Sequence, residues 1–189
     1  MILHGKKIEE NNGQLFLKST IDTYTKILYN FVRRFGFSDG DTEDILQTIF
    51  IKIWKNQDSF DEEKASLKTW VFTIAKNTIY DALRKKKNTK VVFSLDQQDE
   101  SISIENITDI SHDIFQLLER GDIKNKVLDA INSLNEVEKT ILLLHVEESL
   151  TFSELAVIFN SPLNTIKSNY RRSLLKLKLV LQEMHQNKN

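Results

Sequence analysis

The chain has 189 residues, of which 40% are hydrophobic and 28% charged, and its formal net charge at pH 7 is −1. It has no cysteine, which excludes disulfides and thiolate metal sites, and its five glycines and single proline supply too few tight turns for an all-β fold. Since no uncharged stretch approaches the length of a membrane span and no apolar run of signal-peptide length opens the chain, we expect a helical, cytoplasmic protein without membrane insertion.

Three helices are predicted in the first half of the chain. Apolar residues recur at helical spacing over 14–35, where Gly36 ends the helix, and again from about 41 to 54. Acidic residues at the start of this second helix complement the positive end of its dipole. After a loop over 56–65, a third helix opens near Ser66 and ends in a basic run.

Residues 88–121 interrupt this pattern and are rich in acids. We predict an acidic, flexible linker there, with the alternating residues 101–104 as an alternative short strand. On this interpretation the protein is all-α, with two small helical domains over 1–87 and 122–189.

Capping patterns mark the helices of the second domain. After an amphipathic helix over 127–134, two pairs of residues have capping-box spacing, namely Asn135 with Glu138 and Thr151 with Glu154. Ser161 and Pro162 are predicted to supply the N-cap and the first residue of a long helix that runs beyond residue 181. A short helix, a tight turn and a long helix are typical of a helix-turn-helix.

The long helix has the chemistry of a DNA-binding element. No acid occurs from residue 160 to residue 182, which favours contact with phosphates. Asparagine and arginine can hydrogen-bond base edges, and lysine and serine more often anchor phosphates. A solvated basic face is the alternative interpretation, but the helix-turn-helix favours DNA. The predicted DNA-contacting residues are Thr165, Lys167, Ser168, Asn169, Arg171, Arg172 and Lys176.

Three segments resemble a known family. Residues 149–173 (SLTFSELAVIFNSPLNTIKSNYRRS) resemble the promoter-reading domain of extracytoplasmic-function (ECF) sigma factors, although response regulators share part of this pattern. Residues 44–54 (DILQTIFIKIW) resemble the core-polymerase-binding helix of that family, and residues 59–86 its promoter-melting segment. Because these blocks occur in the right order over about residues 15–185, the chain is similar to ECF sigma factors along nearly its whole length.

The resemblance implies partners and site residues. The partners would be core RNA polymerase, promoter DNA and an anti-sigma factor, and the loop 56–65 would hold a base flipped from the −10 element. The implied −10 contacts are Phe60, Ser66, Lys76, Asn77, Arg84 and Lys85. The implied polymerase contacts are Asp44, Gln47, Phe50, Ile51 and Trp54, although by periodicity alone Trp54 is a core residue.

Three positions depart from the family pattern. Thr48 stands where glutamate is usual, Asn164 where glycine is usual and Asn169 where arginine is usual. The first departure affects one expected polymerase contact, and the last implies an altered recognition of the −35 element.

Two other classes of protein compete with this interpretation. A conventional helix-turn-helix regulator would bind duplex DNA unaided, but the nearly neutral net charge favours a factor that depends on polymerase. A magnesium-dependent nuclease would use the acids near Asp44, but their dipole role is simpler. We therefore expect a sigma factor that directs promoter-specific transcription initiation, with no catalytic residue, metal or cofactor.

Overall fold

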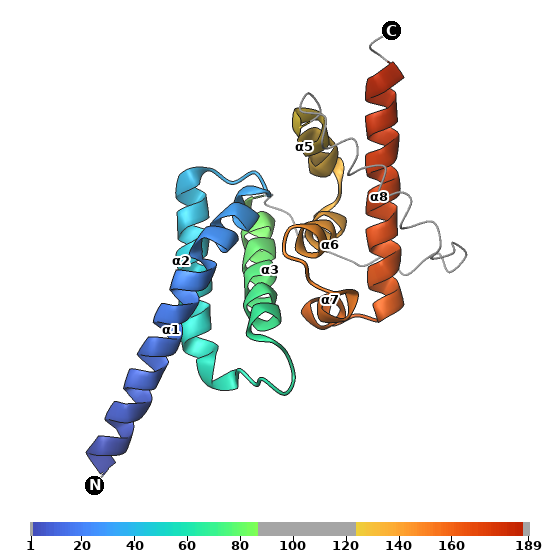
Figure 1. Ribbon diagram of the computed structural model, residues 1–189. Helices are drawn as coiled ribbons and strands as arrows, with labels where there is room; N and C mark the ends of the chain where they lie inside the picture. The colour runs from blue at the N-terminus through green and yellow to red at the C-terminus, as the bar shows by residue number, and fades with distance from the viewer. Residues whose placement is uncertain (1, 87–123, 187–189) are drawn as a thin grey trace. The chain divides into compact units, whose positions relative to one another are not determined.

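The computed structural model describes residues 2–86 and 124–186, and the side chains of residues 13–86 and 129–180. Every element in these two ranges is a helix (Figure 1). The chain divides into two compact units, Met1–Val91 and Val92–Asn189. The predicted all-α class with two helical domains is confirmed, whereas the predicted linker and the alternative strand at 101–104 lie outside the described residues.

The first unit is a three-helix arrangement built around α2. Its helices are α1 (Ile2–Arg33), α2 (Asp39–Asn56) and α3 (Leu67–Lys86), with a short 3-10 helix, η1 (Gln57–Ser59), after α2. Helix α2 packs against both α1 and α3. The largest fully buried side chains between them are Leu28, Phe31, Ile49, Ile53, Phe72 and Ile79. Each such side chain stabilises the fold by about 1.5–3 kcal/mol.

The connection between α1 and α2 follows from two local features. Gly36 adopts a φ of +75°, which glycine reaches at little cost, in the turn that follows the end of α1 at Arg33. The Ser38 hydroxyl accepts a hydrogen bond from the Asp41 N–H at 3.1 Å and caps α2. Helix α2 therefore begins at Asp39, slightly earlier than the predicted start near Asp41. Helix α1 begins at Ile2, long before the predicted start at residue 14.

The second unit packs its helices around α8. They are α5 (Lys124–Ser133), α6 (Glu136–Val146), α7 (Phe152–Phe159) and α8 (Leu163–Gln186), and α8 contacts each of the other three. Both predicted capping boxes are confirmed, at Asn135 with Glu138 and at Thr151 with Glu154. They satisfy backbone N–H groups that would otherwise lack partners at the starts of α6 and α7.

Helices α7 and α8 form the predicted helix-turn-helix. Asn160 lies in the left-handed region, with φ 48° and ψ 53°, and the Ser161 N–H donates to Ala156 O at 3.0 Å, which closes α7. The predicted N-cap at Ser161 is wrong by one residue. The Pro162 carbonyl accepts the first α8 bond, from Ile166 N at 3.2 Å, while the Ser161 hydroxyl donates to Phe159 O.

Candidate nucleic-acid and partner interface

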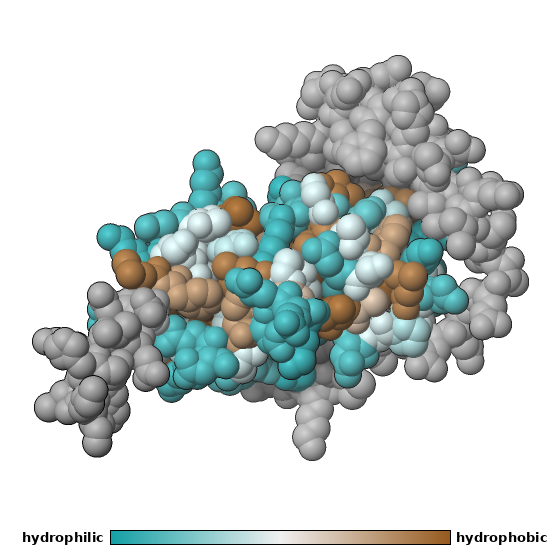
Figure 2. Space-filling model, turned by 60° about the horizontal axis from the view of Figure 1, so that its bottom comes forward, coloured by the Kyte–Doolittle hydropathy of each residue, from teal (hydrophilic) through white to brown (hydrophobic). Residues whose placement is uncertain are grey.

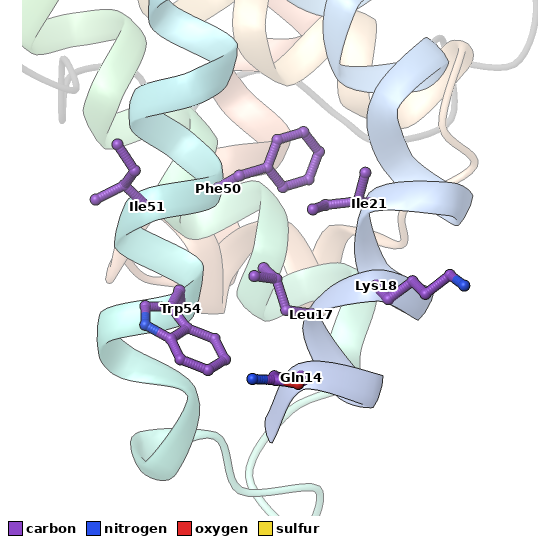
Figure 3. Close-up of a pocket in the computed structure, with 7 residues that line it drawn as sticks. All are labelled: Gln14, Leu17, Lys18, Ile21, Phe50, Ile51 and Trp54. Atoms are coloured by element: carbon purple, nitrogen blue, oxygen red, sulfur yellow. The ribbon is translucent and has the colours of Figure 1, made fainter. Parts of the chain in front are cut away.

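An apolar groove of about 480 Å³ lies between α1 and α2 (Figure 3). In the close-up, Leu17 of α1 and Trp54 of α2 lie opposite each other, whereas the Lys18 amine points away from them. Ile51 is 53% exposed and Trp54 38%. The residues that line the groove are Gln14, Leu17, Lys18, Ile21, Phe50, Ile51 and Trp54. The structure thus brings three residues of the predicted polymerase surface together with α1 side chains that the sequence analysis did not assign.

The two polar residues of the predicted polymerase surface lie exposed on α2. Asp44 and Gln47 stand one turn apart, and Gln47 lies one turn before Ile51, so these side chains follow one stripe of the helix. Thr48 donates its hydroxyl to Asp44 O at 2.9 Å. At the position where the family usually has a glutamate, this chain therefore presents a hydroxyl that is bonded to its own helix.

The segment between α2 and α3, residues 57–66, is here named the capture loop. Phe60 does not stand in solvent but packs between two helices. Its ring centroid lies 5.3 Å from that of Trp70 on α3 and 6.0 Å from that of Phe16 on α1. Aromatic pairs at these distances contribute stabilisation in addition to that from burying their apolar surface. This position favours an anchoring role for Phe60, and the predicted base contact stays a prediction.

Asp61 organises the middle of the capture loop. Its carboxylate accepts the Glu63 N–H at 3.0 Å and pairs with the Lys64 amine at 2.7 Å, and its carbonyl accepts the Ala65 N–H at 3.2 Å. The hydrogen bond from Lys64, followed by that from Glu63, lowers the pKa of Asp61. The sequence analysis gave Asp61 no role.

Ser66 closes the capture loop by capping α3. Its hydroxyl oxygen accepts the Thr69 N–H at 3.2 Å, and its carbonyl accepts the Trp70 N–H at 3.0 Å. The predicted DNA contact of Ser66 stays a prediction, since the oxygen already serves the helix. The packing of Phe60, the hydrogen bonds of Asp61 and the cap at Ser66 thus hold the loop through contacts within the chain.

The predicted −10 residues on α3 do not share one face. Asn77 and Arg84 are seven residues apart and lie on the same side of the helix, whereas Lys76 and Lys85 are nine apart and point roughly 180° away from each other. Asn77, Arg84 and Lys85 are exposed. Arg84 pairs with Asp81, which also lies 3.4 Å from the Lys52 amine.

Lys76 differs from its neighbours because it is partly removed from water. Burial lowers the pKa of its amine to about 8. A lysine in such an environment gains more from a nearby phosphate than an exposed one does, because an opposite charge offsets the loss of hydration.

On α8, the predicted DNA-contacting residues fall into two groups. Thr165, Lys167, Ser168 and Arg172 are half-buried and Lys176 is exposed, while Asn169 is 2% and Arg171 is 9% exposed. The Asn169 amide donates to Thr165 O at 2.8 Å, and its oxygen accepts a guanidinium N–H of Arg172 at 3.0 Å. Asn169 is therefore placed to orient Arg172. The base contacts predicted for Asn169 and Arg171 stay predictions.

Lys176 is exposed, but its amine pairs with a buried acid of α6. Its amine lies 2.7 and 2.8 Å from the two carboxylate oxygens of Glu138, whose side chain is 2% exposed. The same carboxylate accepts the Asn135 N–H in the α6 capping box. The amine that we predicted to bind DNA thus already neutralises a buried acid.

An aromatic cluster fixes the helix-turn-helix to α6, and the sequence analysis missed it. The ring of His145 stacks on Phe152 of α7 at 4.3 Å and meets Tyr170 of α8 edge-on at 4.8 Å. A ring nitrogen of His145 also lies 2.8 Å from Leu150 O. Burial raises the pKa of Tyr170. The spacing of the histidines in the sequence did not indicate this contact, because Tyr170, one partner of His145, lies far from it along the chain.

The molecular surface in Figure 2 has hydrophobic residues scattered among hydrophilic ones. Among residues 13–86 and 129–180, the exposed large hydrophobic residues are Leu15, Ile51, Trp54, Val146, Val157, Leu163 and Leu179. Across residues 2–86 and 124–186, no helix is long and apolar enough to cross a membrane. Among the described side chains, those of residues 13–86 and 129–180, no three histidine, aspartate or glutamate groups are placed so as to hold a metal ion.

Two family models match the chain, one in each unit. The model of Sigma-70 region 2 matches residues 20–89, and the model of Sigma-70 region 4 matches residues 124–177. The first match includes the capture loop and α3, and the second includes the helix-turn-helix. The early part of α1 precedes the first match.

Individual proteins are similar over most of the chain. The ECF RNA polymerase sigma factor RpoE of Cereibacter sphaeroides is 30% identical over 173 residues, which cover 92% of this chain and 90% of that protein. SigW of Bacillus subtilis, also an ECF sigma factor, is 26% identical and covers 95% of each chain. The sigma factor RpoE of Bartonella quintana, solved in complex with the anti-sigma factor NepR, has a similar fold, with a TM-score of 0.60 at 23% identity over 87% of this chain and 96% of that one.

Proposed function

The chain belongs to the ECF sigma factors, and from that premise we propose that its first unit carries separate surfaces for binding polymerase and for opening the promoter. It is a promoter-recognising sigma factor that acts with RNA polymerase in transcription initiation. Its role is regulatory recognition of DNA, and it performs no catalysis of its own. We assign polymerase binding and the recognition and melting of the −10 element to residues 1–87. Recognition of the −35 element is assigned to residues 122–189, and residues 88–121 are assigned as a linker.

The polymerase surface comprises Asp44, Gln47, Phe50, Ile51 and Trp54 on α2. The observation that carries this assignment is the groove, because three of these residues line it and two of the three are substantially exposed. Exposed aromatic and aliphatic side chains at a concave site are the usual anchors of protein interfaces. The acid and the amide add polar contacts along the same stripe of the helix.

The capture loop and α3 form the −10 surface. Strand separation is nearly balanced unless the emerging bases are held, and each captured base contributes about 1–3 kcal/mol. A loop that is ordered in advance spends little of this energy on its own ordering. The acidic residues of the loop, from Asp58 to Glu63, repel DNA phosphates, so the loop favours contact with bases. Asn77, Arg84 and Lys85 on α3 contact the sugar-phosphate backbone of the DNA nearby.

The −35 element is recognised by α8 in the second unit. Its beginning follows the turn of the helix-turn-helix, which is the end that enters the major groove in this motif. Lys167 and Ser168 anchor phosphates, and Arg172, oriented by Asn169, contacts a base or a phosphate. Because this chain has asparagine at 169, its −35 preference differs from that of relatives with arginine there.

An anti-sigma factor is the third partner that we assign to the chain. The related RpoE of Bartonella quintana was solved with such an inhibitor, NepR. Exposed apolar residues occur in both units, at Trp54 and Val157 for example, and an inhibitor that covers Trp54 would block polymerase binding. We place the protein in the cytoplasm, where polymerase and DNA are found.

Run-off transcription with core polymerase tests the function. Adding the chain to core polymerase should produce defined transcripts from a subset of genomic fragments, and neither component alone should do so. A matched binding assay uses the chain without polymerase on the same fragments. Tight, specific binding by the chain alone, without added transcription, would instead identify a conventional helix-turn-helix regulator.

A further inference from the structure

We propose that Phe16 is a positioning residue for promoter opening, because it holds the capture loop in the conformation that receives a base. Phe16 lies in the part of α1 that precedes the Sigma-70 region 2 match, which begins at residue 20. The inference rests on the proposed function of the capture loop. It adds that the part of α1 before residue 20 determines how well the loop holds a captured base.

The first observation is a cluster of three rings from three elements. Phe16 of α1 lies 6.0 Å from Phe60 of the loop and 6.4 Å from Trp70 of α3, and Phe60 and Trp70 are 5.3 Å apart. All three side chains are half-buried. Without Phe16, Phe60 would keep one of its two aromatic neighbours and expose part of its ring to water.

The second observation is a close approach between α1 and a side chain of the loop, one turn earlier on the helix. A Cβ atom added at Gly13 would lie 2.9 Å from the side-chain Nε2 of Gln57, the first residue of the loop. The Gln57 side-chain oxygen is buried there and has no hydrogen-bond partner among the described residues. Residues 13 and 16 share one face of α1, so this face meets the loop at residues 57 and 60.

A neighbouring face of α1 contributes to the groove through Gln14, Leu17 and Ile21. The two faces are separable, because Phe16 is not among the lining residues. Leu15, the adjacent residue, is 59% exposed and serves as a matched control. A change at Phe16 should therefore alter the loop without altering the polymerase surface.

The test measures open-complex formation by holoenzyme assembled from the full chain. Permanganate reactivity of thymines in the −10 element reports the open fraction, and a separate titration reports the affinity for core polymerase. Phe16→Ala should lower the open fraction by about fivefold, which corresponds to the loss of one of the weaker base contacts. The affinity for core polymerase should not change. Leu15→Ala should change neither quantity, and Phe16→Leu should restore most of the opening.

Two further variants show whether Phe16 acts through the loop. If it does, Phe16→Ala combined with Phe60→Ala should open no less than Phe60→Ala alone.

The outcomes separate the inference from its premise. If Phe60→Ala leaves opening unchanged, the capture loop does not have the proposed function. If Phe60→Ala reduces opening but Phe16→Ala does not, or if the two defects multiply, Phe16 does not position the loop. A loss of core affinity in Phe16→Ala that matches its loss of opening would likewise overturn the inference.

Discussion

Lys176 of α8 and Glu138 of α6 form an ion pair in which the amine lies 2.7 and 2.8 Å from the two carboxylate oxygens. Glu138 is almost fully buried, at 2% exposure, whereas the Lys176 side chain is 50% exposed. Removing the amine would leave a buried carboxylate without its counter-charge. The pair thus links the start of α6 to the middle of α8.

We expect Lys176→Ala to destabilise the second unit by roughly 1–3 kcal/mol, less than a fully buried pair would lose because the lysine is half exposed. Urea unfolding of the full chain measures this loss. Lys167→Ala is the matched control on the same helix and should leave the unfolding midpoint nearly unchanged. Equal stability of both variants would show that the ion pair contributes little.

The DNA-binding roles of Asn169 and Lys167 should differ in kind. Asn169→Ala should weaken −35 binding although Asn169 is buried, because Arg172 loses the acceptor that orients it. Combined with Arg172→Ala, it should add no further loss. Lys167→Ala should weaken binding to all sequences and reduce the salt slope by about one. Binding of the holoenzyme to promoter DNA over a range of salt concentrations measures these effects. If the losses of binding free energy from Asn169→Ala and Arg172→Ala were additive, Asn169 would not act by orienting Arg172.

Lys76 should make the stability of the first unit depend on pH. Its pKa is about 8 in the folded protein and 10.5 ordinarily, so between these values the unfolded chain binds more protons. The free energy of unfolding therefore rises with pH over this window, and the penalty for charging the buried amine is present below pH 8. Lys76→Met should abolish this rise. The urea unfolding midpoints of the wild type and of Lys76→Met, measured from pH 7 to 10.5, test this. If the two proteins showed the same dependence of midpoint on pH, the rise would not come from Lys76.

The elements predicted from the sequence are those whose determinants are local. Both capping boxes were predicted because each pairs residues three apart, and the tight turn was predicted from Asn160 to Pro162. The Glu138–Lys176 pair joins residues 38 apart, and hydrophobic periodicity does not state which acid meets which base. For the same reason Lys176 was taken for a DNA contact.

The candidate site shows the same limit. Periodicity and resemblance placed Phe50, Ile51 and Trp54 on one surface, and the groove brings them together. The packing of Phe60 against Phe16 was not predicted, because nothing in the sequence of a polar loop indicates which helix it touches. The burial of Asn169 was missed because periodicity placed it among the polar faces of α8.

We propose that polymerase binding and strand opening use separate surfaces of the first unit. Permanganate footprinting of the −10 element, at saturating core polymerase, distinguishes these surfaces. Asn77→Ala should assemble with wild-type affinity but lower the thymine reactivity several-fold, and a promoter pre-melted by mismatches should restore reactivity because the unpairing is already complete. Asp44→Ala with Gln47→Ala should lower core affinity and open normally once saturated. If Asn77→Ala instead lowered the affinity for core polymerase and opened the duplex normally once saturated, the two surfaces would be wrongly assigned.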